Sequence, residues 1–173
     1  MAKQKCGAYR RGDTRPARGY AHPGVDIKKD DMLVVDATNG HYVRPIAGAA
    51  GDLETQVTGF VGIAMHGVKS TDAQRTIEIA TEGDFMYPLA AADQLNIGDY
   101  LTAAVVGSAI QAQTVEKTTT AANALFVVVS TTGVPDFDHA ASKSAITAAD
   151  LDDKDEVEGR ILLANGALGS DLA

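Results

Sequence analysis

The sequence contains one cysteine, no tryptophan and few aromatic residues, which make up 5% of the 173 positions. The single cysteine, Cys6, excludes an internal disulfide and any zinc site that is built from several cysteines. The scarcity of aromatic residues argues against a large ligand pocket lined by rings. Alanine, glycine, threonine and valine are abundant instead, and this mixture favours short strands joined by tight turns.

Long apolar segments are absent as well. The longest apolar run covers residues 124–129, whereas a membrane-spanning helix needs about 20 apolar residues. The first residues are polar and basic and contain no apolar stretch of the kind that a secretory signal requires. We therefore expect no secretory signal and no association with a membrane.

The patterns that usually accompany catalysis or metal binding are also missing. No Gly-x-Ser-x-Gly nucleophile motif and no glycine-rich phosphate-binding motif occurs. The carboxylates of Glu82 and Asp84 flank a glycine turn, but no neighbouring residue supports acid–base chemistry there. The histidines stand singly, without a His-x-x-x-His pair that would indicate zinc. They are His22, His41, His66 and His139.

The acidic run at residues 150–156 is the strongest candidate for a cation site. A calcium loop places acidic residues at alternate positions and a glycine at the sixth. Counted from Asp150, the fifth position is Lys154 and the sixth is Asp155, so the pattern fails. Two interpretations of this run remain open: a solvated acidic loop, and a contact with the basic segment of a neighbouring copy. We predict a protein that is not an enzyme, with no catalytic residue, no metal and no cofactor.

Positive charge is concentrated at the N-terminus. Residues 1–30 carry eight Lys and Arg and three acidic residues, a net charge of +5, whereas the remainder carries −13. Glycine and proline interrupt this segment without helical or strand periodicity, so we predict an extended arm that becomes ordered on binding. An acidic body repels nucleic acid, so the expected partner is an acidic protein surface. The arm combines tyrosine with arginine, as binding hot spots do, and its predicted contact residues are Tyr9, Arg10, Arg11, Arg15, Arg18 and Tyr20.

Short strands separated by turns begin at residue 31. Asn39-Gly40 predicts a two-residue hairpin turn, Gly62 predicts a bulge within a strand, and Gly107-Ser108 predicts a second tight turn. Alternation over residues 75–81 predicts that Ile77 and Ile79 face inward. The predicted strands cover residues 32–35, 41–43, 60–64, 75–81, 85–87, 100–103, 109–110, 125–130 and 161–163, with a short helical turn over 89–95.

Together these elements predict an all-β fold. We expect a small barrel or sandwich of about 8–10 short strands, with an extended N-terminal arm and at most short helical turns. The predicted division is a basic arm over 1–30, a β-barrel core over 31–130, an acidic polar connection over 131–156, and a last strand with a small-residue tail over 157–173.

The central stretch of the sequence resembles the small capsid-decoration, or cement, proteins of tailed phages. The resemblance rests on three segments, which are Phe60-Val61-Gly62-Ile63-Ala64, residues 77–85 (IEIATEGDF), and Gly98-Asp99-Tyr100-Leu101. It covers roughly residues 31–130, whereas the basic arm and the part after Gly133 depart from the simple family pattern. The family has no catalytic residues to carry over.

The resemblance implies a virion structural protein, made in the host cytoplasm, that forms a homo-oligomer, with a trimer favoured. Such a protein binds the outer surface of an icosahedral bacteriophage head, bridges subunits of the major capsid protein and stabilises the capsid. The arm residues would then contact the capsid or a neighbouring subunit, and a chain without residues 1–24 is expected to remain a folded oligomer that has lost most of its affinity for the shell. Two alternatives stay open, namely another virion β-barrel, such as a head-fibre base or a tail component, and a clip-like module that binds a small ligand.

Overall fold

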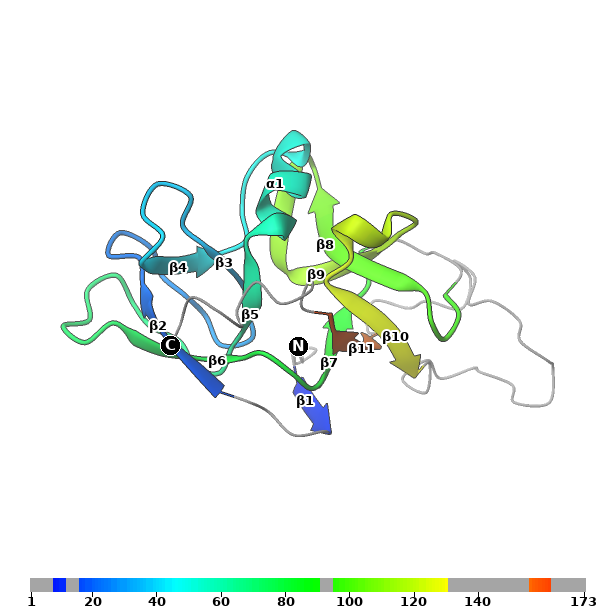
Figure 1. Cartoon of the computed structure of the whole chain (residues 1–173), viewed down its shortest axis with the longest axis horizontal. Coiled ribbons are helices and arrows are strands. Elements are labelled where there is room, and N and C mark those ends of the chain that lie inside the picture. Colours follow the sequence, from blue (N-terminus) through cyan, green and yellow to red (C-terminus); the bar gives the residue numbers. More distant parts are fainter. Residues whose placement is uncertain (1–7, 12–15, 91–94, 131–155, 163–173) are drawn as a thin grey trace, which may run out of the picture.

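The computed structural model describes residues 8–11, 16–90, 95–130 and 156–162. It is mostly β, with eleven strands and one short α-helix in these ranges, which confirms the predicted all-β class. Figure 1 shows two β units side by side, a small barrel on the left and a curled sheet on the right. The helical segments are η1 (Ala50–Asp52), α1 (Leu53–Thr58), which lies at the top between the two units, and η2 (Ala121–Asn123).

The barrel is a closed ring of five strands in the order β2-β4-β3-β5-β6. Closure comes from β2, which pairs in parallel with β4 on one side and antiparallel with β6 on the other. A closed ring leaves no strand edge without a partner. The five strands are β2 (Pro16–Ala21), β3 (Met32–Val35), β4 (Tyr42–Pro45), β5 (Phe60–Ala64) and β6 (Thr76–Ala80).

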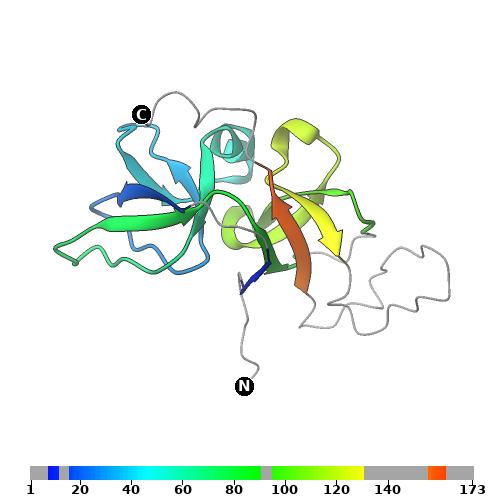
Figure 2. The same cartoon turned by 60° about the horizontal axis from the view of Figure 1, so that its bottom comes forward.

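The second unit is a six-stranded sheet in the order β1-β7-β11-β10-β8-β9. The sheet curls, and the amide of Ala90, just beyond β7, donates a hydrogen bond to the carbonyl of Val115 in β9 at 2.9 Å. Figure 2 shows β11 and β10 next to each other in this sheet. Its strands are β1 (Ala8–Arg11), β7 (Asp84–Pro88), β8 (Tyr100–Val106), β9 (Ala109–Thr118), β10 (Phe126–Ser130) and β11 (Glu156–Ile161).

Strand β3 lies between the two hydrophobic cores of the molecule. Consecutive side chains of a strand point to opposite faces, so Leu33 packs inside the barrel while Met32 and Val34 pack into the core shared with the curled sheet. All three are essentially fully buried. An uninterrupted apolar run is what a strand with two buried faces requires. The larger core is centred on Phe126, whose ring lies 5.3 Å from the ring of Tyr87.

The glycine in β5 forms the predicted bulge. Leu33 faces Gly62 across the β3–β5 ladder but Val34 faces Phe60, so Val61 is the extra residue of β5. Gly62 has a φ of +137°, and a Cβ built on it would lie 2.2 Å from the carbonyl oxygen of Ala80. Only glycine therefore fits this position.

The turn predictions had different outcomes. Gly107 and Ser108 both have positive φ and connect Val106 to Ala109, which confirms a two-residue hairpin turn. The two-residue turn at Asn39-Gly40 is wrong, because the amide of Asp36 bonds the carbonyl of Tyr42 and closes a five-residue loop.

The side chain of Asp36 explains this longer loop. Its carboxylate accepts hydrogen bonds from the amides of Thr38, at 3.0 Å, and of Asn39, at 2.8 Å. An Asx turn of this kind starts the loop three residues before Asn39-Gly40. The Asn-Gly pair therefore lies inside a loop whose course Asp36 sets.

The described parts of the predicted arm, residues 8–11 and 16–30, differ from a free extension, since residues 8–11 form β1 in the curled sheet. Residues 16–21 are extended as expected, but they form β2, a wall of the barrel. Ala17 packs against the barrel core and Gly19 lies close to Ile79, while Arg18 and Tyr20 point outward. The inward residues of β2 are small, so the period of two that marks a strand is not visible as hydrophobic alternation. Buried Ile27 ties the following loop to the same core.

The C-terminal elements begin earlier than predicted. The last strand was expected over 161–163, but β11 spans Glu156–Ile161 and lies between β7 and β10. Gly159 is the ladder partner of Val128 in β10, and a Cβ at this position would lie 3.0 Å from the Cβ of Phe126. Residues 131–155 of the predicted acidic connection over 131–156, and residues 91–94 of the predicted helical turn over 89–95, lie outside the described residues. Leu89, at the start of that turn, instead forms a parallel bridge with Val115.

Candidate functional site

The structure describes five of the six predicted contact residues, and these five lie on two different strands. Arg15 lies outside the described residues, and Tyr9, Arg10 and Arg11 belong to β1, which pairs with β7 in the curled sheet. Only Arg18 and Tyr20 share a described surface, the outward side of β2. Tyr20 is 63% exposed, the second most exposed of the large apolar side chains in the described residues.

Strand β4 extends this surface. The parallel pairing sets Tyr20 next to Tyr42, and Arg44 lies two residues further along β4, on the same side of the strand as Tyr42. We call the outward side chains of Arg18, Tyr20, Tyr42 and Arg44 the tyrosine–arginine face. From Arg18 to Arg44 it covers four residue steps along the strands, or about 13 Å.

Neighbouring side chains hold the face in position. The ring of His22 meets the ring of Tyr42 edge to face, with 5.9 Å between their centroids. Glu78 of β6 lies opposite Arg18 in the antiparallel ladder, a cross-strand pair of opposite charges that favours this register.

Arg44 is fixed by two partners. Its Nε lies 3.3 Å from a carboxylate oxygen of Asp36, and an Nη donates to the side-chain oxygen of Gln56 in α1 at 3.1 Å. The backbone amide of Asn39 holds the pKa of Asp36 below its ordinary value, with smaller contributions from the amide of Thr38 and the charge of Arg44. Asp36 therefore remains ionised and orients the guanidinium.

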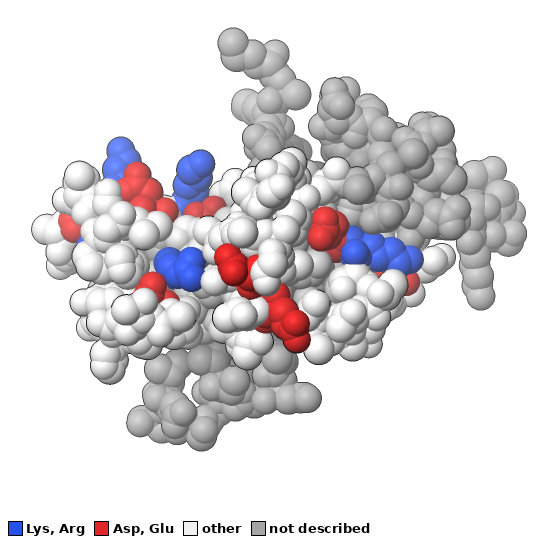
Figure 3. All heavy atoms as spheres, turned by 90° about the horizontal axis from the view of Figure 1, so that it is seen from above, with Lys and Arg blue, Asp and Glu red and all other residues white. Residues whose placement is uncertain are grey.

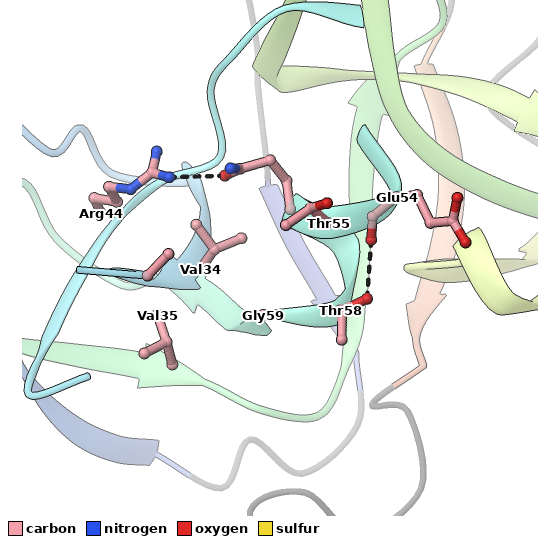
Figure 4. Close-up of a pocket in the computed structure, with 9 residues that line it drawn as sticks. Val34, Val35, Arg44, Glu54, Thr55, Thr58 and Gly59 are labelled. Carbon is pink, nitrogen blue, oxygen red and sulfur yellow. Dashed lines mark hydrogen bonds between the residues drawn. The ribbon is translucent and has the colours of Figure 1, made fainter. Parts of the chain in front are cut away.

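A pocket of about 490 Å³ opens beside Arg44, between the end of β3 and α1. Figure 4 shows Val34 and Val35 on one side and α1 on the other, with the carboxylate of Glu54 pointing away from Arg44. The hydroxyl of Thr58 is occupied, since it donates to the carbonyl of Glu54 at 2.9 Å. The pocket is lined by Val34, Val35, Ala37, Arg44, Glu54, Thr55, Gln56, Thr58 and Gly59.

Sequence reasoning missed Tyr42, Arg44 and this pocket. The alternation of Tyr42 and Arg44 in a short strand was a usable signal, because residues two apart share a face. The parallel pairing of β2 with β4 was not visible in the sequence, since it depends on how the barrel closes.

Two further polar side chains, those of Asp84 and Arg75, are engaged in contacts within the fold. Asp84, one of the two carboxylates beside Gly83, is buried and forms an ion pair with Arg160 at 2.8 Å. The guanidinium of Arg75 donates to the carbonyls of His22 and Val25 and so ties the loop after β2 to β6. Such contacts stabilise the structure and bring no reactive groups together.

No group of three or more His, Cys, Asp or Glu side chains that could hold a metal ion occurs in the described ranges. Cys6, His139 and the acidic run at 150–155 lie outside these ranges. Figure 3 shows basic and acidic side chains interspersed on the face seen from above, rather than one basic patch. Among the described residues, no helix is long and apolar enough to cross a membrane.

Two adjacent carboxylates lie where the barrel meets the curled sheet. Asp31 is buried and accepts hydrogen bonds from the amide of Lys28, at 2.7 Å, and from the side chain of Gln113, at 2.9 Å. Asp30 has a φ of +71°, and its carbonyl accepts a hydrogen bond from the hydroxyl of Tyr87 at 2.8 Å. Burial raises the pKa of both carboxyl groups, that of Asp30 to about 6, although Lys29 opposes the shift.

The raised pKa of Asp30 predicts a measurable dependence of stability on pH. The folded state binds the proton more tightly than the unfolded state, so the free energy of unfolding falls as the pH rises from about 4 to about 6. Asp30→Asn cannot ionise and tolerates a positive φ. We expect this variant to be about 1 kcal/mol more stable than the wild type at pH 7. A pKa difference of about two units between the folded and unfolded states corresponds to about 2.7 kcal/mol, and the partial exposure of Asp30 reduces this free energy.

Urea unfolding at pH 4 and pH 7 measures this effect, and replacement of the exposed Glu54 by Gln is the matched control. The loss of stability between the two pH values is expected to be smaller in Asp30→Asn than in the wild type and the control. An equal loss in all three proteins would contradict the assignment of a raised pKa to Asp30.

Comparisons with known proteins provide no identification. No protein-family model matches the sequence, no curated protein is similar to it, and no solved structure matches its fold.

Proposed function

We propose that the protein is a structural component of a tailed-phage virion that binds the outside of the head as a homo-oligomer, with a trimer favoured. In this role it bridges subunits of the major capsid protein and stabilises the shell. The observation that carries the proposal is the tyrosine–arginine face, on which exposed Arg18 and Tyr20 stand on a closed barrel wall. Tyrosine and arginine, together with tryptophan, are enriched among the residues that dominate protein–protein binding energies.

The sequence resemblance is consistent with this role. Its three segments form β5, β6 with the start of β7, and the entry to β8, so they run from the barrel into the curled sheet. The first two segments are largely buried, whereas Leu101 is the buried residue of the third. The segments therefore account mainly for the framework, and none of them belongs to the tyrosine–arginine face.

A symmetric oligomer multiplies the effect of one modest contact surface. Several copies of the face acting together on a symmetric shell give an avidity that one copy lacks, provided that all can engage at once. A cyclic oligomer presents the same face to each equivalent site.

Co-sedimentation with tailed-phage heads that were assembled without their decoration protein tests the proposal. The wild-type chain is expected to form an oligomer by light scattering and to sediment with the heads. The double variant Arg18→Glu/Tyr20→Ser changes only outward side chains of β2, so it is expected to keep its circular dichroism spectrum and to lose at least about tenfold in affinity, or about 1.4 kcal/mol.

Lys69→Glu is the matched control, because it reverses one exposed cation in the connection between β5 and β6, which is not part of the tyrosine–arginine face. It is expected to sediment as the wild type does. A monomeric chain that fails to sediment with heads would refute the proposal, and binding confined to tails or portals would favour the alternative of a tail or fibre component.

A further inference from the structure

We propose that the tyrosine–arginine face and the pocket beside Arg44 form one continuous site for an extended, acidic segment of a partner protein, with one apolar side chain of that segment seated in the pocket. This inference rests on the proposed function, from which it takes that the partner is a protein. It adds that the bound part of the partner is extended and carries acidic and apolar side chains.

The shape of the site favours a chain over a compact ligand. Arg44 both ends the tyrosine–arginine face and lines the pocket. The face adds about 13 Å of surface along the strands, which corresponds to about four residues of an extended peptide. The pocket of about 490 Å³ by itself is in the size range of small-ligand sites, but it opens onto this longer surface.

The chemistry favours acidic side chains beside apolar ones. Val34, Val35 and Gly59 give the pocket an apolar wall, as Figure 4 shows. Arg18 and Arg44 lie at the two ends of the face, with the rings of Tyr20 and Tyr42 between them. Every second side chain of an extended segment points to the same side. A segment in which apolar and acidic residues take turns at these positions would place apolar side chains against the wall and rings and carboxylates at the guanidinium groups.

The site is preorganised, which lowers the cost of binding. Asp36 and Gln56 hold the guanidinium of Arg44 from two sides, and its side chain keeps 22% of its surface exposed. The backbone beneath belongs to β3 and β4, two paired strands of a closed barrel. The groups that would meet the partner are therefore already in place.

Titration of the ¹⁵N-labelled full chain with a dodecapeptide of three Glu-Ser-Val-Ser repeats, which presents glutamate and valine on the same side when extended, tests the inference without any phage head. We expect amide shifts confined to residues 18–20, 34–37, 42–44 and 54–59, with a Kd below about 1 mM. A peptide in which lysine replaces glutamate is expected to cause no such shifts.

Two variants probe the two parts of the site. Thr55→Trp fills the pocket from the exposed surface of α1, and Arg18→Glu reverses the charge at the far end of the face. Each is expected to weaken binding of the acidic peptide at least about tenfold. Thr71→Trp, at an exposed position of the connection between β5 and β6, is the matched control and is expected to bind as the wild type does.

Equal binding of the two peptides, shifts outside these residues, the absence of binding, or wild-type affinity in folded Thr55→Trp would each overturn the inference. If the chain binds heads but not the acidic peptide, the inference fails and the proposed function stands. If it binds the peptide at this site but no head, the proposed function fails and the site remains.

Discussion

Deletion of residues 1–24 is expected to abolish the cooperative unfolding of the protein, because it removes β2. This strand pairs with both β4 and β6 and closes the barrel. Without it, Val43, Ile77 and Ile79 of the barrel core lose their cover. Exposure of three such side chains costs about 1.5–3 kcal/mol each, a total comparable to the whole stability of a typical domain, which is about 5–15 kcal/mol.

Thermal unfolding followed by circular dichroism, together with binding of a hydrophobic dye, measures this effect. We expect a broad or absent transition and strong dye binding in the truncated chain. Removal of residues 1–7 leaves all described strands present and serves as the control, with an unfolding transition like that of the full chain. A deletion of 1–24 that unfolds as cooperatively as the full chain would show that β2 is dispensable, as a free arm would be.

The second large effect is expected at the β5 bulge. Gly62→Ala should lower the free energy of unfolding by about 2–5 kcal/mol, which combines the cost of a positive φ with that of an overpacked site. The added methyl group would lie 2.2 Å from the carbonyl oxygen of Ala80 and 2.8 Å from a side-chain carbon of Ile79. The neighbouring atom at 2.2 Å belongs to the backbone of β6, so it cannot move aside without disturbing the β5–β6 ladder.

Gly98→Ala separates these two contributions. Gly98 also has a positive φ, of +96°, but a Cβ there would meet no atom within 4 Å. Its replacement is expected to cost about 1–2 kcal/mol from backbone conformation alone. Urea unfolding of both variants gives the comparison, and equal losses would show that the close approach to Ala80 is not what requires glycine at position 62.

The part of the fold that the sequence predicted rests on local pattern. The alternation of Thr76, Ile77, Glu78 and Ile79 placed the isoleucines inward, and β6 has this burial pattern. Gly62 was predicted to lie at a bulge because a glycine inside a strand weakens the strand and often marks a bulge. Gly107-Ser108 was identified as a turn for a similar reason, since few residue pairs accept positive φ at both positions.

The interpretation of residues 16–30 as part of a free arm shows where local pattern fails. Glycine, proline and charge are typical of an unpaired segment, and β2 contains all three. The barrel interior beside β2 has room only for small residues, as the 3.1 Å approach of Ile79 to a Cβ at Gly19 shows. A strand whose inward residues are small does not show the alternation of large apolar and polar residues by which a strand is recognised in a sequence.

The sequence alone determined the all-β class, most strand positions, the bulge at Gly62 and the tight turn at Gly107-Ser108, because each depends on the backbone preferences and polarity of neighbouring residues. The tertiary structure decided that β2 closes a barrel, that Tyr20 lies beside Tyr42, and that Arg44 ends this face at a pocket. Those relations join residues that are distant in the chain, and they arise from the way strands pair and close, which no short segment encodes.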